Sequence, residues 1–370
     1  MFEGAGKQLT LQVNSKKSWA GVDVFVTRHL LLQNISYNFD LDICFSSRHD
    51  AVRIDFFYSF VRERIESEFN SGIAVGQYHH SSVAHEILGG LSRGLVNGWA
   101  QRYSVGVHYQ QDEYQLDPLL TTSSILPFDQ KIIAPFVRYE VVEDKFEKVT
   151  NRNLINRAEF FNMGLAAKVQ LGRSMWDSTR KYWIYDGSVS EGWHLSAKQS
   201  LFLSGHLSGR NGNEGGDVRL LGGLARYYRS QSGHGLFYAE AAVDIVHQGT
   251  VSDQLLLGGD TGLRGYPLRY QTGTQRVLLS LEQRGYSDLY LFRIFRVGGG
   301  VFYDVGRAWG GVNHNLTNPI WLNDVGIGIR MFNDDRSAFG NVIHIDLAFP
   351  INRTEDIKSV QLLIKGHDSF

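Results

Sequence analysis

Hydrophobic and polar residues alternate along much of the chain with a period of two. Apolar side chains occupy every second position from Tyr37 to Phe45 and from Val52 to Phe60, and mostly polar residues lie between them. The same alternation recurs from Tyr103 to Tyr109 and from Ile343 to Phe349. Because successive side chains of a strand point to opposite faces, each segment predicts a β-strand with one apolar and one polar face.

The polar faces of these strands carry full charges, among them Asp40, Asp42, Arg53 and Asp55. Charges suit a water-filled lumen, and segments of about ten residues are long for soluble strands but sufficient for tilted strands that cross a membrane. Aromatic residues also stand at strand ends, as Tyr103 does, in the manner of interface girdles. We therefore predict a membrane barrel whose apolar face points outward to lipid.

The amino-acid composition supports an all-β fold. Glycine is frequent, with 40 residues, and proline is rare, with 6; 22 Phe and 17 Tyr stand against only 4 Met. Segments rich in Ala, Leu, Glu and Lys, which would predict helices, are almost absent, whereas many strands closed by Gly and Asn turns fit this composition. Short and long connections also alternate along the chain, as they do in outer-membrane barrels.

Charge and cysteine content exclude several other classes. Lys plus Arg number 37 and Asp plus Glu 38, a net charge of −1, so we expect no nucleic-acid partner. The single cysteine, Cys44, excludes an intramolecular disulfide and a cysteine-rich zinc site. No apolar run reaches about 18 residues, and no signal peptide is visible at the start. We expect one barrel domain over residues 1–370, without periplasmic domains, metal or cofactor.

A glycine-rich segment from Leu257 to Tyr266 carries the sequence Leu-Gly-Gly-Asp-Thr-Gly-Leu-Arg-Gly-Tyr. It resembles the conserved loop of the BamA/TamA-type outer-membrane assembly and secretion barrels, the bacterial surface antigen superfamily that includes FhaC-type two-partner secretion pores. The stretch from Gly300 to Gly306 resembles the superfamily's Phe-x-Asp-x-Gly strand signature, and Glu282 is a third match. The resemblance implies a 16-stranded antiparallel barrel in which this loop, loop six, folds into the lumen.

The strand count after the motif agrees with that resemblance. We read five strands, near 274–285, 296–308, 321–332, 341–350 and 359–370, and five strands follow loop six in a barrel of 16. The 370 residues also allow about 23 for each strand with its connection, enough for about ten residues across the bilayer.

Strand periodicity places two carboxylates on one face of neighbouring strands. Val277, Leu279 and Leu281 fall on the lipid parity, so Glu282 faces the lumen; by the same parity Phe302 and Asp304 face inward on the next strand. The guanidinium of Arg264 can bond carboxylates bidentately if loop six enters the lumen.

As the resemblance implies, we read Leu263, Arg264, Gly265 and Tyr266 as a lock motif. Its lumenal partners would be Glu282, Phe302, Asp304 and Gly306, with Gly265 allowing a tight turn and Tyr266 packing beside Phe302. The lock is expected to be structural and gating rather than catalytic. The alternative is a solvated loop arginine with carboxylates that merely line a wet pore.

The C-terminal strand resembles a barrel-assembly signal, with Leu362, Ile364 and the terminal Phe370 on one parity. Gly366 and Asp368 depart from the apolar or aromatic residues usual at those positions.

Two other local patterns have simpler explanations. Gly90 to Gly94 matches the Gly-x-Ser-x-Gly nucleophile motif around Ser92, yet it lacks the strand-to-helix context that the motif needs. His79, His80 and His85 are better read as surface or loop histidines than as metal ligands, because neighbours on a strand point to opposite faces.

We therefore expect an integral protein of the Gram-negative outer membrane that inserts outer-membrane proteins or translocates polypeptides, and not an enzyme. Its partners would be outer-membrane lipids, unfolded polypeptide substrates, the barrel-assembly machinery and, in a longer chain, periplasmic POTRA-type domains. Alternatives are a membrane anchor or export barrel for a patatin-like autotransported lipase and, more remotely, a soluble β enzyme using Ser92.

Overall fold

The structure is a computed structural model of the whole chain, and side chains are described from residue 76 onward. The backbone is described for residues 7–15, 18–31, 34–46, 51–70, 73–116, 126–175, 178–212, 216–231, 234–250, 253–311, 320–333, 342–355 and 357–367.

The described residues form 21 β-strands and contain no α-helix. The first half of the chain forms β1 (Lys7–Ser15), β2 (Ser18–Leu31), β3 (Asn34–Ser46), β4 (Ala51–Asn70), β5 (Ile73–Val96), β6 (Trp99–Gln115), β7 (Gln130–Glu143), β8 (Phe146–Thr150), β9 (Ala158–Asn162), β10 (Ala166–Arg173) and β11 (Tyr182–Ser196). The second half forms β12 (Gln199–Gly212), β13 (Val218–Ser230), β14 (Gly235–His247), β15 (Leu255–Leu257), β16 (Gln271–Gly273), β17 (Gln275–Leu291), β18 (Phe295–Trp309), β19 (Leu322–Asn333), β20 (Val342–Pro350) and β21 (Gln361–His367). Thus no helix in these ranges could serve as a membrane span.

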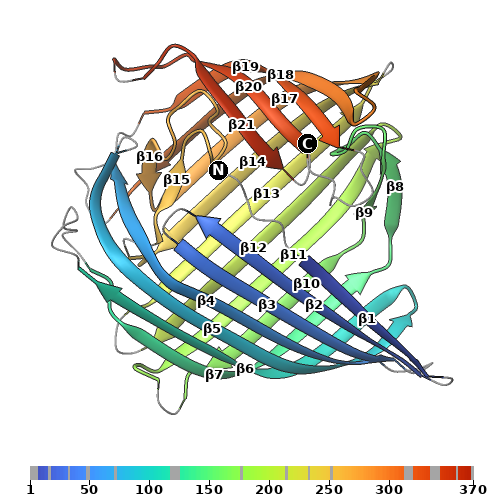
Figure 1. Cartoon of the computed structure of the whole chain (residues 1–370), viewed down its shortest axis with the longest axis vertical. Helices are drawn as coiled ribbons and strands as arrows, with labels where there is room; N and C mark the ends of the chain where they lie inside the picture. Colours follow the sequence, from blue (N-terminus) through green and yellow to red (C-terminus); the bar gives the residue numbers. More distant parts are fainter. Residues whose placement is uncertain are drawn as a thin grey trace.

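Seventeen of the strands form one sheet in which each strand pairs antiparallel with the next. The sequence of neighbours runs from β1 to β7, then β10 to β14, then β17 to β21. Two hairpins, β8–β9 and β15–β16, stand apart from it. The sheet curls on itself, and β8–β9 lies at the end opposite β15–β16 (Figure 1). Among the described strands, no pairing joins β1 to β21.

The predicted all-β antiparallel class is confirmed, but the sheet has 17 strands rather than 16. The five strands predicted after loop six are present as β17 to β21. The additional strand therefore lies before loop six, where the number 16 came from chain length and from the resemblance rather than from a separate pattern for each strand.

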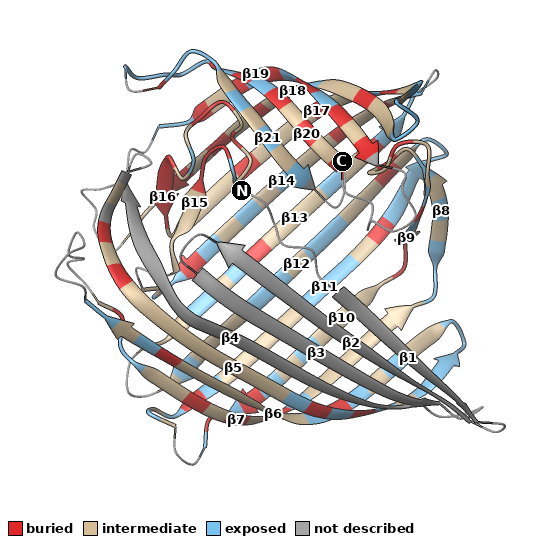
Figure 2. Ribbon diagram, viewed as in Figure 1, coloured by how far each residue is buried: buried red, intermediate tan, exposed pale blue. Residues whose placement is uncertain are grey.

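From β17 to β20, where side chains are described, the curled sheet is apolar outside and carries charged residues inside. On β19, Val325, Ile327 and Ile329 are exposed on the outer face, whereas Asp324 and Arg330, of opposite parity, are fully buried on the inner face. This alternation runs along β17 to β20 (Figure 2). A water-soluble sheet buries its apolar face instead, so the outer face has the character of a surface in contact with lipid.

The described buried apolar residues gather in three clusters, of which the smallest contains Ile132, Ala134 and Tyr182 and the other two involve the hairpins or their connections. Of these two, the first contains loop-six residues together with residues of β17, β18, β19 and the connection between β20 and β21: Leu257, Leu263, Tyr266, Tyr270, Leu278, Ala308, Leu322 and Ile357. The second contains Ile155 from the connection between β8 and β9, with Tyr228, Leu236, Tyr238, Tyr286, Phe332 and Val342 from the sheet. Each hairpin therefore rests on its own apolar cluster.

Candidate functional site

Loop six, residues 248–274, joins β14 to β17 and folds onto the inner face of the sheet. Its tip is a compact turn in which the backbone N–H groups of Thr261 and Leu263 both donate to the carbonyl oxygen of Gly258 at 3.0 Å. Gly262 adopts φ of 114°, a conformation that favours glycine. Leu263 and Tyr266 on either side of Arg264 are buried. The turn therefore directs Arg264 toward the strands rather than toward solvent.

Arg264 forms a two-pronged ion pair with Asp304 on β18. Its Nε donates to Oδ2 at 2.7 Å and its Nη2 to Oδ1 at 2.9 Å. Ser280, which lies opposite Asp304 in the register of β17 and β18, donates its hydroxyl to Oδ1 at 2.5 Å. Parallel N–H···O bonds of this kind fix the orientation of both groups and are stronger than neutral hydrogen bonds.

The guanidinium of Arg264 also contacts an aromatic ring and two further carboxylates. Its central carbon lies 3.4 Å from the ring centroid of Phe302. Its Nη1 lies 3.5 Å from Oε1 of Glu282 and 3.8 Å from Oδ2 of Asp346. Burial disfavours the charged form, but Asp304 and the other carboxylates outweigh it, so the pKa of Arg264 lies above its ordinary value.

Glu282 is shared by three arginines on the inner face. Besides Arg264, it pairs with Arg284 at 3.1 Å and with Arg330 at 2.8 Å. Arg330 in turn pairs with Asp346 on β20. Glu282, Arg284 and Arg330 are all at most 5% exposed, so this is a buried ionic network in which each charge depends on its partners.

Two residues that follow Arg264 attach the loop to β19 and to the connection after β20. The backbone N–H of Gly265 donates to Oδ2 of Asp324 at 3.0 Å. The hydroxyl of Tyr266 lies 3.0 Å from the carbonyl oxygen of Asn323 and 2.9 Å from that of Asn352. Burial raises the pKa of Tyr266 to about 12, so the hydroxyl keeps its proton at neutral pH. Loop six is thus attached to the wall of the sheet at successive residues.

Gly306, the last residue of the strand signature, provides space for the base of loop six. A Cβ atom at this position would lie 3.2 Å from Cδ2 of Leu257 and 2.9 Å from the carbonyl oxygen of Val277. Leu257 is fully buried in the apolar cluster beneath the loop. A side chain at residue 306 would therefore push against the loop and the neighbouring strand.

The structure thus brings Arg264 together with Asp304, Glu282 and Phe302. The ring contact differs from the expectation: the guanidinium of Arg264 lies over the ring of Phe302. The ring of Tyr266 packs beside Tyr270, at 5.8 Å between ring centroids, and its hydroxyl lies beside the carbonyl groups of residues 323 and 352.

Sequence reasoning did not identify several residues that complete the network, namely Ser280, Arg284, Asp324, Arg330 and Asp346. Parity could have placed all five on the inner face, because each lies on the parity opposite to the outward apolar residues of its own strand. Their pairing could not be found this way, because it depends on register. Asp304 lies opposite Asp324, and Gly328 lies opposite Asp346.

The residues of the expected C-terminal assembly signal lie in part on β21. Leu362 and Ile364 are 62% and 65% exposed on the outer face of the sheet. Gly366 is close to the end of this strand, and a Cβ atom there would have no neighbour within 4 Å. Phe370 and Asp368 lie outside the described residues.

The nucleophile-like pattern around Ser92 and the three neighbouring histidines, residues 79, 80 and 85, all lie on β5. Ser92 is inside this strand, where its hydroxyl accepts a bond from the backbone N–H of Gly94 at 3.2 Å, and it is not at a strand-to-helix turn. His80 pairs with Asp112 at 3.1 Å and stacks on Tyr114. Over the part of the chain that the structure describes, no group of three or more His, Cys, Asp or Glu side chains is arranged to hold a metal ion.

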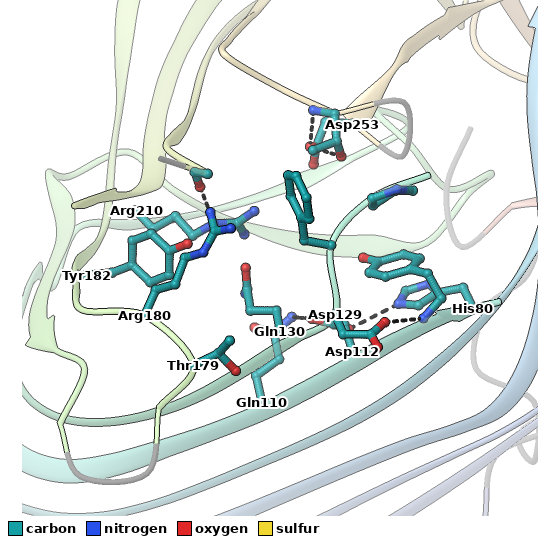
Figure 3. Close-up of a pocket in the computed structure, with 15 residues that line it drawn as sticks. His80, Gln110, Asp112, Asp129, Gln130, Thr179, Arg180, Tyr182, Arg210 and Asp253 are labelled. Carbon is teal, nitrogen blue, oxygen red and sulfur yellow. Dashed lines mark hydrogen bonds and ion pairs between the residues drawn. The ribbon is translucent and has the colours of Figure 1, made fainter. Parts of the chain in front are cut away.

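A polar cavity of about 240 Å³ lies among the connections at the loop-six end of the sheet (Figure 3). Its labelled lining residues are His80, Gln110, Asp112, Asp129, Gln130, Thr179, Arg180, Tyr182, Arg210 and Asp253. The carboxylates are engaged by neighbouring groups: Asp112 by His80, and Asp253 by the backbone and hydroxyl of Thr250, both at 2.8 Å. We read this cavity as part of the polar interior.

Neither a protein-family model nor a curated protein matches the sequence. Among solved structures, the chain is similar to BamA from Haemophilus ducreyi lacking POTRA domains 1-3, with 13% identity and a TM-score of 0.47 over 98% of this chain and 70% of that one. It is also similar to CdiB from Acinetobacter baumannii, with 10% identity and a TM-score of 0.41 over 98% of this chain and 58% of that one. CdiB from Escherichia coli is similar with 12% identity and a TM-score of 0.45, over 98% of this chain and 61% of that one. The chain thus spans less than two thirds of each CdiB chain.

Proposed function

We propose that this chain is an integral barrel of the outer membrane that inserts outer-membrane proteins or translocates polypeptides, with loop six locked inside by Arg264. The bidentate pair between Arg264 and Asp304 carries the proposal. This pair attaches a glycine-rich loop to the inner face of the sheet through a buried network of charges. A solvated loop arginine would form no such network.

The distribution of polar and apolar surface supports the membrane location. Exposed apolar residues on the outer face include Val301, Ile327, Leu347, Leu362 and Ile364, from four neighbouring strands. In water this surface would be an aggregation site, whereas in a bilayer it contacts lipid. The charged inner face then lines the lumen, and outer-membrane lipids are the first partners of the protein.

Loop six would act as a reversible obstruction of that lumen. A polypeptide that passes through, or that folds against an opened edge of the sheet, needs space that the loop occupies. Separating Arg264 from Asp304, Glu282 and Asp346 leaves these carboxylates without their shared cation, so the closed arrangement is favoured at rest. This role requires no cofactor, and polypeptide substrates would supply the binding energy for opening.

Two further partners follow from the same proposal. The outward row Leu362 and Ile364, with Phe370 at the end of the chain, would be read by the barrel-assembly machinery when this protein is itself inserted. POTRA-type domains would deliver substrate from the periplasm if this sequence is part of a longer chain.

The test is reconstitution of the purified protein into liposomes made of outer-membrane-type lipids. We expect it to accelerate the folding of an unfolded outer-membrane barrel added from urea, or to admit an unfolded polypeptide into the liposome, where it is protected from added protease. The two readouts separate insertion from translocation. Liposomes containing a porin of similar size are the control. Failure of both readouts, with a correctly inserted protein, would contradict the proposed function.

A further inference from the structure

A second insert enters the curled sheet from the end opposite loop six. Residues 144–165, which we call the β8–β9 insert, join β7 to β10. The backbone N–H of Asp144 donates to the carbonyl oxygen of Gly98 at 2.8 Å, which places the start of the insert beside the tight turn between β5 and β6. Other short turns, such as residues 197–198 and 292–294, close the same end. Figure 1 shows β8 and β9 opposite β15 and β16.

The centre of the insert is anchored by Arg152. Its guanidinium carbon lies 4.9 Å from the ring centroid of Phe161, 5.5 Å from that of Phe202 and 5.4 Å from that of Tyr228. Its Nη2 also donates to the hydroxyl of Ser200 at 2.8 Å. Arg152 is only 7% exposed, and cation–π contacts strengthen when the cation is desolvated. The insert is therefore held against β12 and β13 on the inner face.

The turn of the insert is itself well ordered by local hydrogen bonds. The carboxylate of Glu159 accepts the backbone N–H of Arg152 at 2.9 Å and that of Asn153 at 2.9 and 3.1 Å. The backbone N–H of Asn156 donates to the side-chain oxygen of Asn151 at 2.6 Å. These bonds replace the ones that a regular hairpin would supply, so the turn keeps its shape inside the sheet.

Ile155 extends the insert across the interior. It is fully buried in a cluster whose other members come from five strands: β13, β14, β17, β19 and β20. The side-chain amide of Asn156 also reaches the carbonyl oxygen of Ser287 at 3.4 Å. The insert starts from β7 and returns to β10, but Ile155 packs in one cluster with residues of β19 and β20, many strands away in the sheet. The insert therefore crosses the space that the sheet encloses.

The insert and loop six are connected by a series of hydrogen bonds and ion pairs. Arg284 donates from Nη1 to the carbonyl oxygen of Arg152 at 2.9 Å, and its Nη2 pairs with Glu282 at 3.1 Å. Glu282 pairs in turn with Arg264 of loop six at 3.5 Å. Tyr286 adds a second bond to the carbonyl of Arg152 at 3.2 Å. Two side chains of β17, those of Glu282 and Arg284, thus connect the insert to the lock.

We infer that the β8–β9 insert is a second constriction of the lumen, in series with loop six and coupled to it through Glu282 and Arg284. The inference rests on the proposed function in one respect, that the interior is a water-filled path. Opening one constriction leaves the other in place, so a substrate that enters from one end meets two obstructions in turn. Because both are connected to the carboxylate of Glu282, displacement of the β8–β9 insert weakens the attachment of loop six, and displacement of loop six weakens that of the insert.

The experiment compares single-pore conductance in planar bilayers for four proteins. They are the wild type, a variant in which residues 146–162 are replaced by a short Gly-Ser linker, a variant in which residues 259–269 are so replaced, and the double variant. For two comparable constrictions in series we expect each single replacement to raise conductance about twofold, and the double replacement to exceed the product of the two single changes.

A matched pair of point variants tests the same idea without removing chain. Ile155→Ser breaks the apolar contact that carries the insert across the interior and should also raise conductance. Phe160→Ser alters the same insert at a residue that is 69% exposed and should leave conductance unchanged. Folding of every variant is checked by retention of the heat-modifiable mobility of the barrel in gels.

Coupling between the inserts is read by limited proteolysis. Glu282→Gln should increase cleavage within both residues 144–165 and residues 248–274. Asp186→Asn, which alters the exposed pair of Asp186 with Lys168 at 2.5 Å, should change neither. Increased cleavage in loop six alone would overturn the coupling.

The conductance results separate the two levels of the proposal. If the double variant conducts no better than the loop-six variant, the insert is not a constriction and the inference is wrong, while the proposed function stands. If none of the four folded proteins forms a pore, the water-filled interior is refuted, and both proposals fail together.

Discussion

Arg264 and Asp304 stand 40 residues apart in the sequence and meet through two hydrogen bonds of 2.7 and 2.9 Å. Asp304 is fully buried, so without Arg264 its charge would lose both hydrogen bonds of the fork and keep the one from the hydroxyl of Ser280. The pair therefore attaches loop six to β18, as Gly265 and Tyr266 attach it to β19 and to the connection after β20.

Arg264→Ala should lower the free energy of unfolding by about 3 to 5 kcal/mol, the usual cost of leaving a buried charge without its partner. Urea unfolding in detergent, followed by tryptophan fluorescence, measures this change. Arg264→Lys should recover only part of it, because an ammonium group cannot form the fork with Asp304. Arg226→Ala, in the more exposed pair with Glu240, is the control. Equal stability of the Arg264 and Arg226 variants would contradict the role of the fork.

Gly265→Ala should displace the tip of loop six. A Cβ atom at residue 265 would lie 2.5 Å from Cβ of Asp324, and the backbone N–H of Gly265 donates to the same aspartate. Contacts this short are relieved only by moving the loop or β19, at a typical cost of about 1 to 3 kcal/mol. We expect faster protease cleavage within residues 248–274. Gly89→Ala, where a Cβ atom has no neighbour within 4 Å, should leave the cleavage rate unchanged.

Tyr266→Phe should loosen loop six less than Arg264→Ala or Gly265→Ala does. It removes the hydroxyl that lies within 3.0 Å of two backbone carbonyls but keeps the buried ring. The expected loss of stability is about 1 kcal/mol, the net value of a typical hydrogen bond, with some increase because two acceptors lose a partner. Hydrogen exchange at the backbone of Asn323, whose N–H lies 3.2 Å from the hydroxyl, reports the change directly. Unchanged exchange at Asn323, together with unchanged stability, would show that the hydroxyl is dispensable.

Much of the fold is encoded locally and could be predicted from the sequence. Alternation with a period of two identifies many of the strands and assigns their faces, so the pattern alone places residues such as Glu282 and Asp304 on one face. The glycine-rich segment around Arg264 predicts a loop, again from local sequence alone.

The rest depends on register and on contacts distant in sequence. That Asp304 lies opposite both Ser280 and Asp324 is a property of three paired strands, and no single strand contains it. The β8–β9 insert gives only a weak local signal, because its strands are 5 residues each and its anchor, Arg152, is buried by rings from other strands. The seventeenth strand could not be found by dividing the chain length by an assumed number of strands.

Ile327→Lys tests which solvent the outer face contacts. Ile327 is 54% exposed at the middle of β19. In water an added lysine there would be nearly neutral, but near the centre of a bilayer it should cost about 2 to 4 kcal/mol. We expect slower folding into liposomes and a lower urea midpoint for the inserted protein. Phe292→Lys, at a residue 79% exposed in the turn between β17 and β18, should behave as wild type because a turn lies outside the hydrocarbon. Equal stability of the two variants in lipid would mean that the apolar outer face is covered by something other than the membrane.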